Sequence, residues 1–98
     1  EFRHSSWWQE TVKTTLGNRN ITVCSPDYPG LPNAIEQNTS IGYIRLHGVP
    51  RLFYSEYTTE ELKELLHQIN KFSFREVYVY FNNTASTAGI VNAMEFIK

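Results

Sequence analysis

The chain has 98 residues, with nine basic and ten acidic side chains and a formal net charge of −1 at pH 7. A chain of this length builds one small domain with a single core, and its near-neutral charge excludes a surface-wide attraction to nucleic acid or anionic membranes. Its apolar runs are far too short to span a bilayer and no signal-peptide pattern opens it, so we expect a cytoplasmic protein without membrane contact. The single cysteine, Cys24, agrees with a reducing compartment.

The first part of the chain predicts two strands, one helix and a long loop. Residues 1–4 have the pattern of the last part of a strand. Ser6 and Gln9 fit a capping box, which predicts that a helix follows. The β-branched residues 21–24 predict a short strand. Residues 27–40 contain two proline turns and little periodicity, which indicates a loop with at most one helical turn.

Residues 43–48, with the sequence YIRLHG, alternate between apolar and polar side chains. Successive side chains of a strand point to opposite faces, so Ile44 and Leu46 share one face. Arg45 and His47 share the other. This segment therefore predicts a strand with one buried apolar face and one face of polar, ionisable side chains.

The last part of the chain predicts helix, strand and helix. Thr58 and Glu61 fit a capping box, and apolar residues at i, i+3, i+4 and i+7 within 62–69 predict the helix that follows. Residues 76–82 alternate as a strand, and a final helix is expected from about residue 84 to the chain end. Its predicted apolar face is Ile90, Ala93, Met94 and Ile97.

Alternating strands and helices indicate parallel strands joined by right-handed crossovers. Both faces of an open parallel sheet are normally apolar, whereas one face here is polar. The polar set is Arg45, His47, Tyr78, Tyr80 and Asn82. An α/β barrel accommodates such a face because its interior near the C-terminal mouth holds ligands.

Several separated motifs carry a family resemblance. They are the segments 1–7 (EFRHSSW), 25–26 (SP), 43–48 (YIRLHG) and 77–83 (VYVYFNN), followed by Gly89 and Asn92-Ala93. In this order they resemble the YecE-like domain-of-unknown-function family of bacterial TIM barrels. The resemblance implies that residues 1–98 are a single partial domain, the C-terminal half of a TIM (β/α)8 barrel with its last four βα units. The chain departs from the family pattern at Ser5 and at Cys24, where relatives have proline and an acidic residue.

In such a barrel, functional side chains gather at the C-terminal ends of the strands. We expect ligand contacts from Glu1, Arg3, His4, Arg45, Tyr80 and Asn82, and the same rule also selects Asp27, Arg51 and Asn83. Two inward arginines suit a phosphate or carboxylate, and His47 is the candidate proton carrier because an ordinary histidine titrates near neutrality. A structural ion pair between Glu1 and the arginines, with a merely hydrogen-bonded His47, stays open as the alternative.

Two hypotheses of function follow, and the sequence leaves open whether the protein is an enzyme. The first is binding or conversion of an anionic ligand, phosphorylated or related to nucleic acid, with nucleic acid itself suggested by fold analogy only. The second is a non-catalytic scaffold with a paired-charge interior. No metal or cofactor is predicted, because no metal-binding spacing is present. The unpaired outer strands of a half barrel predict a fragment that self-associates or needs its N-terminal half.

Overall fold

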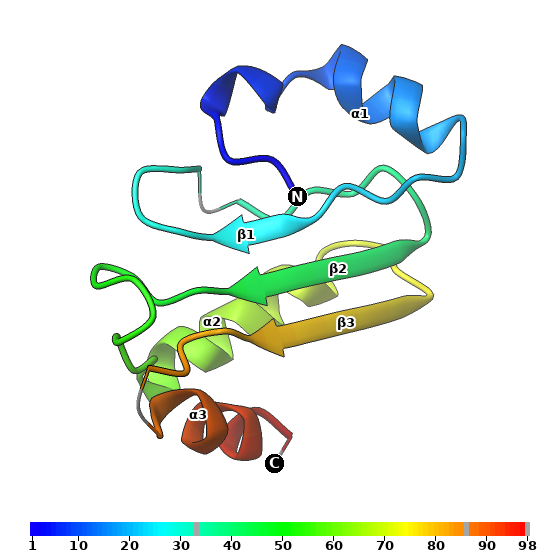
Figure 1. Cartoon of the computed structure of the whole chain (residues 1–98). Coiled ribbons are helices and arrows are strands. Elements are labelled where there is room, and N and C mark those ends of the chain that lie inside the picture. Colours follow the sequence, from blue (N-terminus) through cyan, green and yellow to red (C-terminus); the bar gives the residue numbers. More distant parts are fainter. Residues whose placement is uncertain (33, 86, 98) are drawn as a thin grey trace.

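A computed structural model describes residues 1–32, 34–85 and 87–97 of the chain. Its elements are a short 3-10 helix η1 (Ser5–Trp7), α1 (Glu10–Gly17), β1 (Ser25–Asp27), β2 (Ile41–Leu46), α2 (Thr59–Asn70), β3 (Glu76–Phe81) and α3 (Ala88–Ile97). The three strands form one parallel sheet in the order β1-β2-β3, so their C-terminal ends meet at one edge (Figure 1). The predicted α/β architecture with parallel strands is confirmed.

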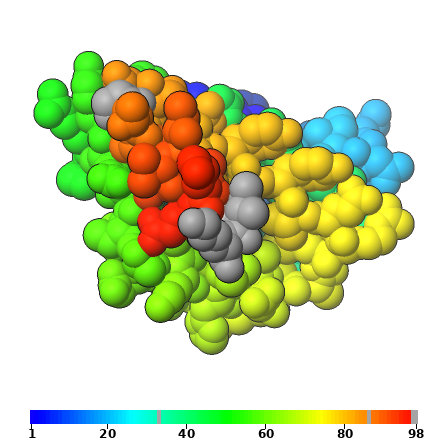
Figure 2. Space-filling model, turned by 90° about the horizontal axis from the view of Figure 1, so that it is seen from below, coloured from blue at the N-terminus to red at the C-terminus, as the bar shows by residue number. Residues whose placement is uncertain are grey.

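The core lies between the sheet and the helices that cover one of its faces. Ile44 and Leu46 of β2 are buried against α2, as their alternation predicted. The other buried members of this core are Tyr57, Leu62 and Ile69. Helices α2 and α3 lie side by side on this face (Figure 2), where the Thr59 hydroxyl donates a hydrogen bond to the Glu95 carboxylate.

The strand register assigns each polar side chain to a face of the sheet. In a parallel pair, residues in register lie on the same face. Leu46 is in register with Asp27 and Phe81, so all three lie on the helix-covered face. Arg45 is in register with Pro26 and Tyr80, and these three lie on the opposite face.

The signals for the long loop and for α2 are confirmed. Residues 28–32 and 34–40 form neither helix nor strand. Thr58 caps α2, because its hydroxyl accepts from the Glu61 amide while the Glu61 carboxylate accepts from the Thr58 amide. Within the described ranges, every helix is too short or too polar to cross a membrane.

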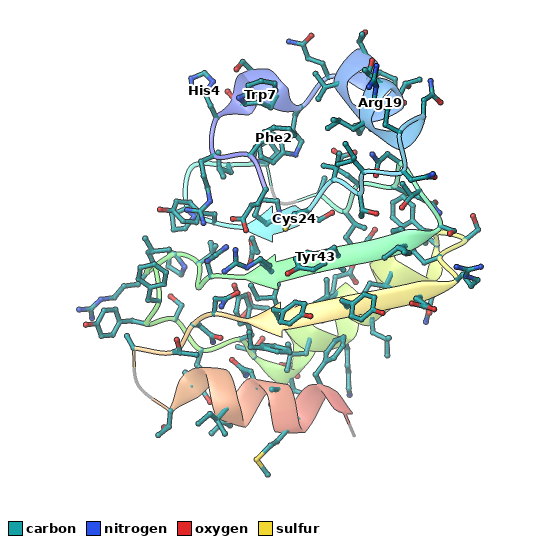
Figure 3. The ribbon with its side chains drawn as sticks, turned by 45° about the vertical axis from the view of Figure 1, so that its right-hand side comes forward. Phe2, His4, Trp7, Arg19, Cys24 and Tyr43 are labelled. Carbon is teal, nitrogen blue, oxygen red and sulfur yellow. The ribbon has the colours of Figure 1, made fainter. Side chains whose placement is uncertain are left out.

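Residues 1–4 form no strand, contrary to the sequence prediction. The N-terminus lies beside β1 (Figure 1), which is only three residues long and contains Pro26, a residue without an amide hydrogen to donate. Side chains hold the segment instead. The ring of Phe2 stacks on Trp7 with 4.6 Å between ring centroids (Figure 3).

The first helix, and the strand predicted at residues 21–24, both begin later than predicted. The Gln9 side chain donates to the Ser6 carbonyl, and the Ser6 amide donates to His4 Nδ1, so no capping box forms and α1 starts at Glu10. The strand expected at 21–24 lies at Ser25–Asp27 instead. The amide of Val23 donates a hydrogen bond to the Asn38 side-chain oxygen, at 3.0 Å. Only the three residues of β1 are in register with β2.

Helix α3 buries a different face from the one predicted. Ile90 is 64% exposed and Met94 is 59% exposed, whereas Ala88 and Asn92 are buried. Hydrogen bonds decide this orientation. Asn92 bonds to the backbone amide and carbonyl of Tyr57, so that side of α3 faces the core. The side chain of Ile97, also part of the prediction, lies outside the described residues.

Candidate functional site

A cluster of polar side chains lies at the C-terminal end of β2, centred on Glu1. One carboxylate oxygen of Glu1 accepts from Arg3 Nε at 2.7 Å, and the other accepts from an Arg45 guanidinium nitrogen at 2.7 Å. His47 Nε2 lies 2.9 Å from the oxygen that Arg3 contacts. The Glu1 side chain is only 10% exposed, so a largely buried carboxylate contacts Arg3, Arg45 and His47, and the Cys24 thiol also donates to it at 3.8 Å. We call Glu1, Arg3, Arg45, His47 and Asn82 the Glu1 cluster.

Three strand ends position this cluster. Arg45 lies near the end of β2, and its Nε donates to Asn82 Oδ1 at 3.0 Å, directly after β3. His47 follows β2, and its backbone amide donates to the carbonyl of Asp27 at the end of β1. Ligand sites of parallel α/β folds form at this edge, because side chains from several strands converge there.

The charges of the cluster fix its protonation. Burial alone would raise the pKa of Glu1, but His47, Arg3 and Arg45 together outweigh it and lower the pKa of that carboxyl. Burial lowers the pKa of His47, against the opposing pull of the Glu1 charge. Near neutral pH the cluster therefore holds an ionised Glu1, a neutral His47 and two guanidinium groups, which leaves an excess of positive charge.

In this state the hydrogen of the His47 ring sits on Nε2 and points to Glu1, because an ionised carboxylate only accepts hydrogen bonds. His47 Nδ1 then carries a lone pair. It is buried, and no polar group among the described residues donates to it. His47 is therefore oriented by Glu1 and retains one free acceptor.

A cavity of about 450 Å³ opens beside the Glu1 cluster. Its lining residues are Arg3, Arg45, His47, Phe53, Asn82, Thr84 and Ala85. The guanidinium of Arg3 stacks 4.5 Å above the ring of Tyr28, which limits its freedom. An arginine has five N–H donors, and the contacts to Glu1 and Asn82 use only part of them. Both guanidinium groups can therefore donate further hydrogen bonds into the cavity.

We expect the fold to lose stability as the pH falls from 7 to 4. The folded-state pKa of His47 lies below its ordinary 6.5 and that of Glu1 below its ordinary 4.5, so the unfolded chain binds protons first. Each contribution is complete above the ordinary pKa and is lost as the pH falls toward the folded-state value. Urea midpoints at pH 7, 5.5 and 4 measure this. The raised pKa of Asp27 acts in the opposite direction, so the series is repeated with Asp27→Asn. A midpoint at pH 5.5 equal to or above that at pH 7 in that variant would contradict the His47 contribution.

Two of the predicted ligand contacts lie apart from the cavity. His4 Nδ1 accepts from the Ser6 amide and caps η1, and Figure 3 shows its ring on the outer side of that turn. Tyr80 is 45% exposed and packs against Tyr43, with 5.1 Å between ring centroids. Neither lines the cavity, whereas the other four predicted contacts and His47 belong to the Glu1 cluster.

The other residues selected by the strand-end rule have different surroundings. Asp27 lies on the helix-covered face, opposite to Arg45, so it is not part of this site. The Arg51 guanidinium stacks 4.5 Å above the ring of Tyr54. Asn83 is fully buried and donates to the carbonyl of Ser55, which is a structural contact.

Sequence reasoning missed Thr84 and Ala85 as cavity residues. The final helix was predicted from residue 84, whereas α3 begins at Ala88, so Thr84 and Ala85 precede it and line the cavity. The Asn82-Asn83 pair was the available signal, because asparagine favours turns over helix interiors. Phe53 also lines the cavity, and its φ of 66° marks a strained backbone at the cavity wall.

Two further features of this site concern metal ligands and the Cys24 thiol. Within residues 1–32, 34–85 and 87–97, no three side chains of His, Cys, Asp or Glu converge to hold a metal ion. Burial, together with the Glu1 charge, raises the pKa of Cys24 to about 12. Its side chain is therefore a thiol at neutral pH, and a thiol is a weak nucleophile.

Fold and site together define an α/β protein whose charged groups gather where parallel strands end. A family model described as "Protein of unknown function DUF72" matches residues 1–98, and the chain belongs to this family. Its fold is similar to the crystal structure of a DUF72 family protein from Thermotoga maritima MSB8, with a TM-score of 0.89 and 31% sequence identity. That match covers 99% of this chain and 43% of the other.

Two crystal structures of a DUF72 family protein from Enterococcus faecalis V583 also share the fold, with TM-scores of 0.83 and 0.80. Their sequence identities are 20% and 22%, and the matches cover 97% and 96% of this chain but 44% of each of those chains. The chain thus spans less than half the length of these relatives. A comparison with curated proteins found no match.

Proposed function

We propose that the chain binds an anionic ligand, phosphorylated or related to nucleic acid, at the C-terminal ends of β2 and β3. The observation that carries this proposal is the charge balance of the Glu1 cluster, in which Arg3 and Arg45 face a single carboxylate beside a 450 Å³ cavity. An anion entering the cavity meets one uncompensated positive charge and several free N–H donors. Arginine is well suited to this role because its planar fork matches phosphate and carboxylate oxygens.

The members of the cluster have separate roles in this proposal. Arg45 is held from both sides by Glu1 and Asn82, so its geometry is fixed before a ligand arrives. Preorganisation of this kind reduces the entropy that binding must overcome. His47 is neutral and oriented by Glu1, and it accepts a proton from the bound ligand if the protein is an enzyme.

The proposal extends to the larger fold: residues 1–98 form the C-terminal half of a TIM barrel of the YecE-like kind, with the cavity at its mouth. The sequential order of parallel strands and the coverage of less than half of each relative support this view. Helix α3 also exposes the apolar residues Ile90, Val91 and Met94. An exposed apolar surface of this kind is typical of a protein–protein contact. In this proposal, an N-terminal half or a second copy of the fragment packs against these residues of α3.

A second candidate function is a non-catalytic scaffold whose charged interior only holds the strands together. The observation in its favour is that Glu1 already binds Arg3, Arg45 and His47 within the chain. Buried charges are normally paired whatever their purpose, so this pairing is compatible with both candidates. A binding experiment distinguishes them.

Replacing Arg45 by alanine is expected to weaken phosphate binding by roughly 10- to 100-fold, the equivalent of losing one charge-assisted hydrogen bond. Calorimetric titration of inorganic phosphate into the longest natural polypeptide that carries residues 1–98 measures this, with circular dichroism to verify the fold. Arg51→Ala is the matched control, because that exposed guanidinium lies outside the cavity lining and its loss should leave the affinity unchanged. If phosphate fails to bind the unmodified protein, or binds Arg45→Ala equally well, the scaffold becomes the better explanation.

A further inference from the structure

The connection between β1 and β2 leaves part of the helix-side face of the sheet uncovered. Neighbouring parallel strands are usually joined by a crossover helix that packs on the sheet. Here residues 28–32 and 34–40 form no helix and are drawn as loop in Figure 1. A cleft of about 380 Å³ lies in the corresponding place, between β1, β2 and α2. It lies on the opposite face of the sheet from Arg45.

The cleft has an apolar floor and an acidic rim. Its floor is formed mainly by Ile35, Ile44, Leu46, Leu62 and Leu65. Four carboxylates, those of Asp27, Glu60, Glu61 and Glu64, also line the cleft, and the remaining lining residues are Ser25, Pro26, Ala34 and Tyr57. Among the described residues that line the cleft there is no lysine, arginine or histidine. The acidic rim is therefore not neutralised from within the cleft.

Asp27 lacks a positive partner in particular. Burial raises the pKa of its carboxyl, and the Glu61 charge raises it further, while the Tyr57 hydroxyl and the nearby His47 act in the opposite direction. His47 is neutral near pH 7 and its ring belongs to the Glu1 cluster on the other face. No ion pair joins Asp27 to any residue of the described ranges. Asp27 is half-buried and hydrogen-bonded by Tyr57, so its negative charge is left to attract a cation from solution.

We propose that this cleft binds a small organic cation with an apolar body, such as an arylalkylamine. The hydrocarbon part lies on the aliphatic floor, and the ammonium group contacts Asp27 and the neighbouring glutamates of α2. The volume of 380 Å³ is within the range of small-molecule sites, roughly 300 to 1,000 Å³. Charge complementarity selects this occupant, because the four carboxylates attract a cation, give a neutral molecule no charge-based gain and repel an anion.

Three probes of nearly equal size test the proposal on the unmodified protein: 2-phenylethylamine, 2-phenylethanol and 3-phenylpropionate. Amide chemical shifts followed by NMR should move at Ile44, Leu46 and Leu62 on addition of the amine. The alcohol should bind at least 10-fold more weakly and the acid not at all. Equal affinity for the amine and the alcohol, or shifts spread over the surface away from these amides, would overturn the proposal.

Asp27→Asn supplies a second test, since it removes the charge and keeps an oxygen that can accept from Tyr57. We expect amine affinity to fall at least 10-fold while inorganic phosphate binding at the Glu1 cluster stays unchanged. Glu56→Gln is the matched control, because this exposed glutamate is not part of the cleft lining. An unchanged amine affinity in Asp27→Asn refutes the proposed role of Asp27. If the variant fails to fold, the comparison of the three probes still decides.

Discussion

Replacing Asn92 by leucine is expected to lower the free energy of unfolding by about 3–5 kcal/mol. Asn92 is fully buried, and its side-chain oxygen accepts from the Tyr57 amide and from Asn83, while its side-chain nitrogen donates to the Tyr57 carbonyl. Leucine has a similar size but leaves the amide and the carbonyl of Tyr57 buried without partners, while Asn83 keeps only its bond to the Ser55 carbonyl. Each such group costs about 1–3 kcal/mol. Urea denaturation followed by circular dichroism measures the change.

Asn70→Leu is the matched control for this experiment. Asn70 is exposed at the end of α2, and a surface substitution of this kind changes stability by no more than about 0.5 kcal/mol. An Asn92→Leu protein as stable as the control would show that the polar contacts do not fix α3 on the sheet. The apolar face with Ile90 and Met94 would then be the alternative face by which α3 packs on the sheet.

Replacing Glu1 by glutamine is expected to have the second largest effect, because it removes the charge at the centre of the cluster. The pKa of His47 should fall further, since the Glu1 charge is the main influence that raises it. Stability at pH 7 should fall by about 1–2 kcal/mol, a modest value because Arg3 and Arg45 are partly exposed to solvent. NMR titration of the His47 ring measures the pKa, and urea denaturation measures the stability.

The same variant should bind inorganic phosphate more tightly, about 10-fold, because the two arginines lose their internal competitor for hydrogen bonds. Glu10→Gln is the control: this exposed carboxylate pairs with Lys13 on α1, so its loss should change neither the His47 titration nor phosphate binding. A His47 pKa that is unchanged or raised in Glu1→Gln would mean that the contact between the two side chains is not populated in solution.

The alternation of β2 separates two sites of opposite charge. Arg45 faces the cavity with its excess of positive charge, whereas Leu46, the next residue, faces the cleft with its acidic rim. Successive residues of a strand point to opposite faces, so one strand contributes to both sites without bringing them into contact. Ligands of opposite charge would therefore bind on opposite faces of the sheet and would not compete directly.

The sequence by itself determined the elements whose signals are local. The capping box of Thr58 and Glu61 and the leucine spacing predicted α2, because both depend on residues three or four apart. The alternation in residues 43–48 predicted which side chains of β2 are buried, and it placed Arg45 and His47 together. Both now contact Glu1.

Only the tertiary structure decided the features that depend on distant partners. The position of β1 follows from its register with β2 and from the bond between Val23 and Asn38. The buried face of α3 follows from the contacts of Asn92 with Tyr57, 35 residues away. Asp27 lies on the helix side of the sheet for the same reason, since register places it beside Leu46. Hydrogen bonds between segments far apart in the chain leave no periodic pattern in the sequence, so only the folded structure reveals them.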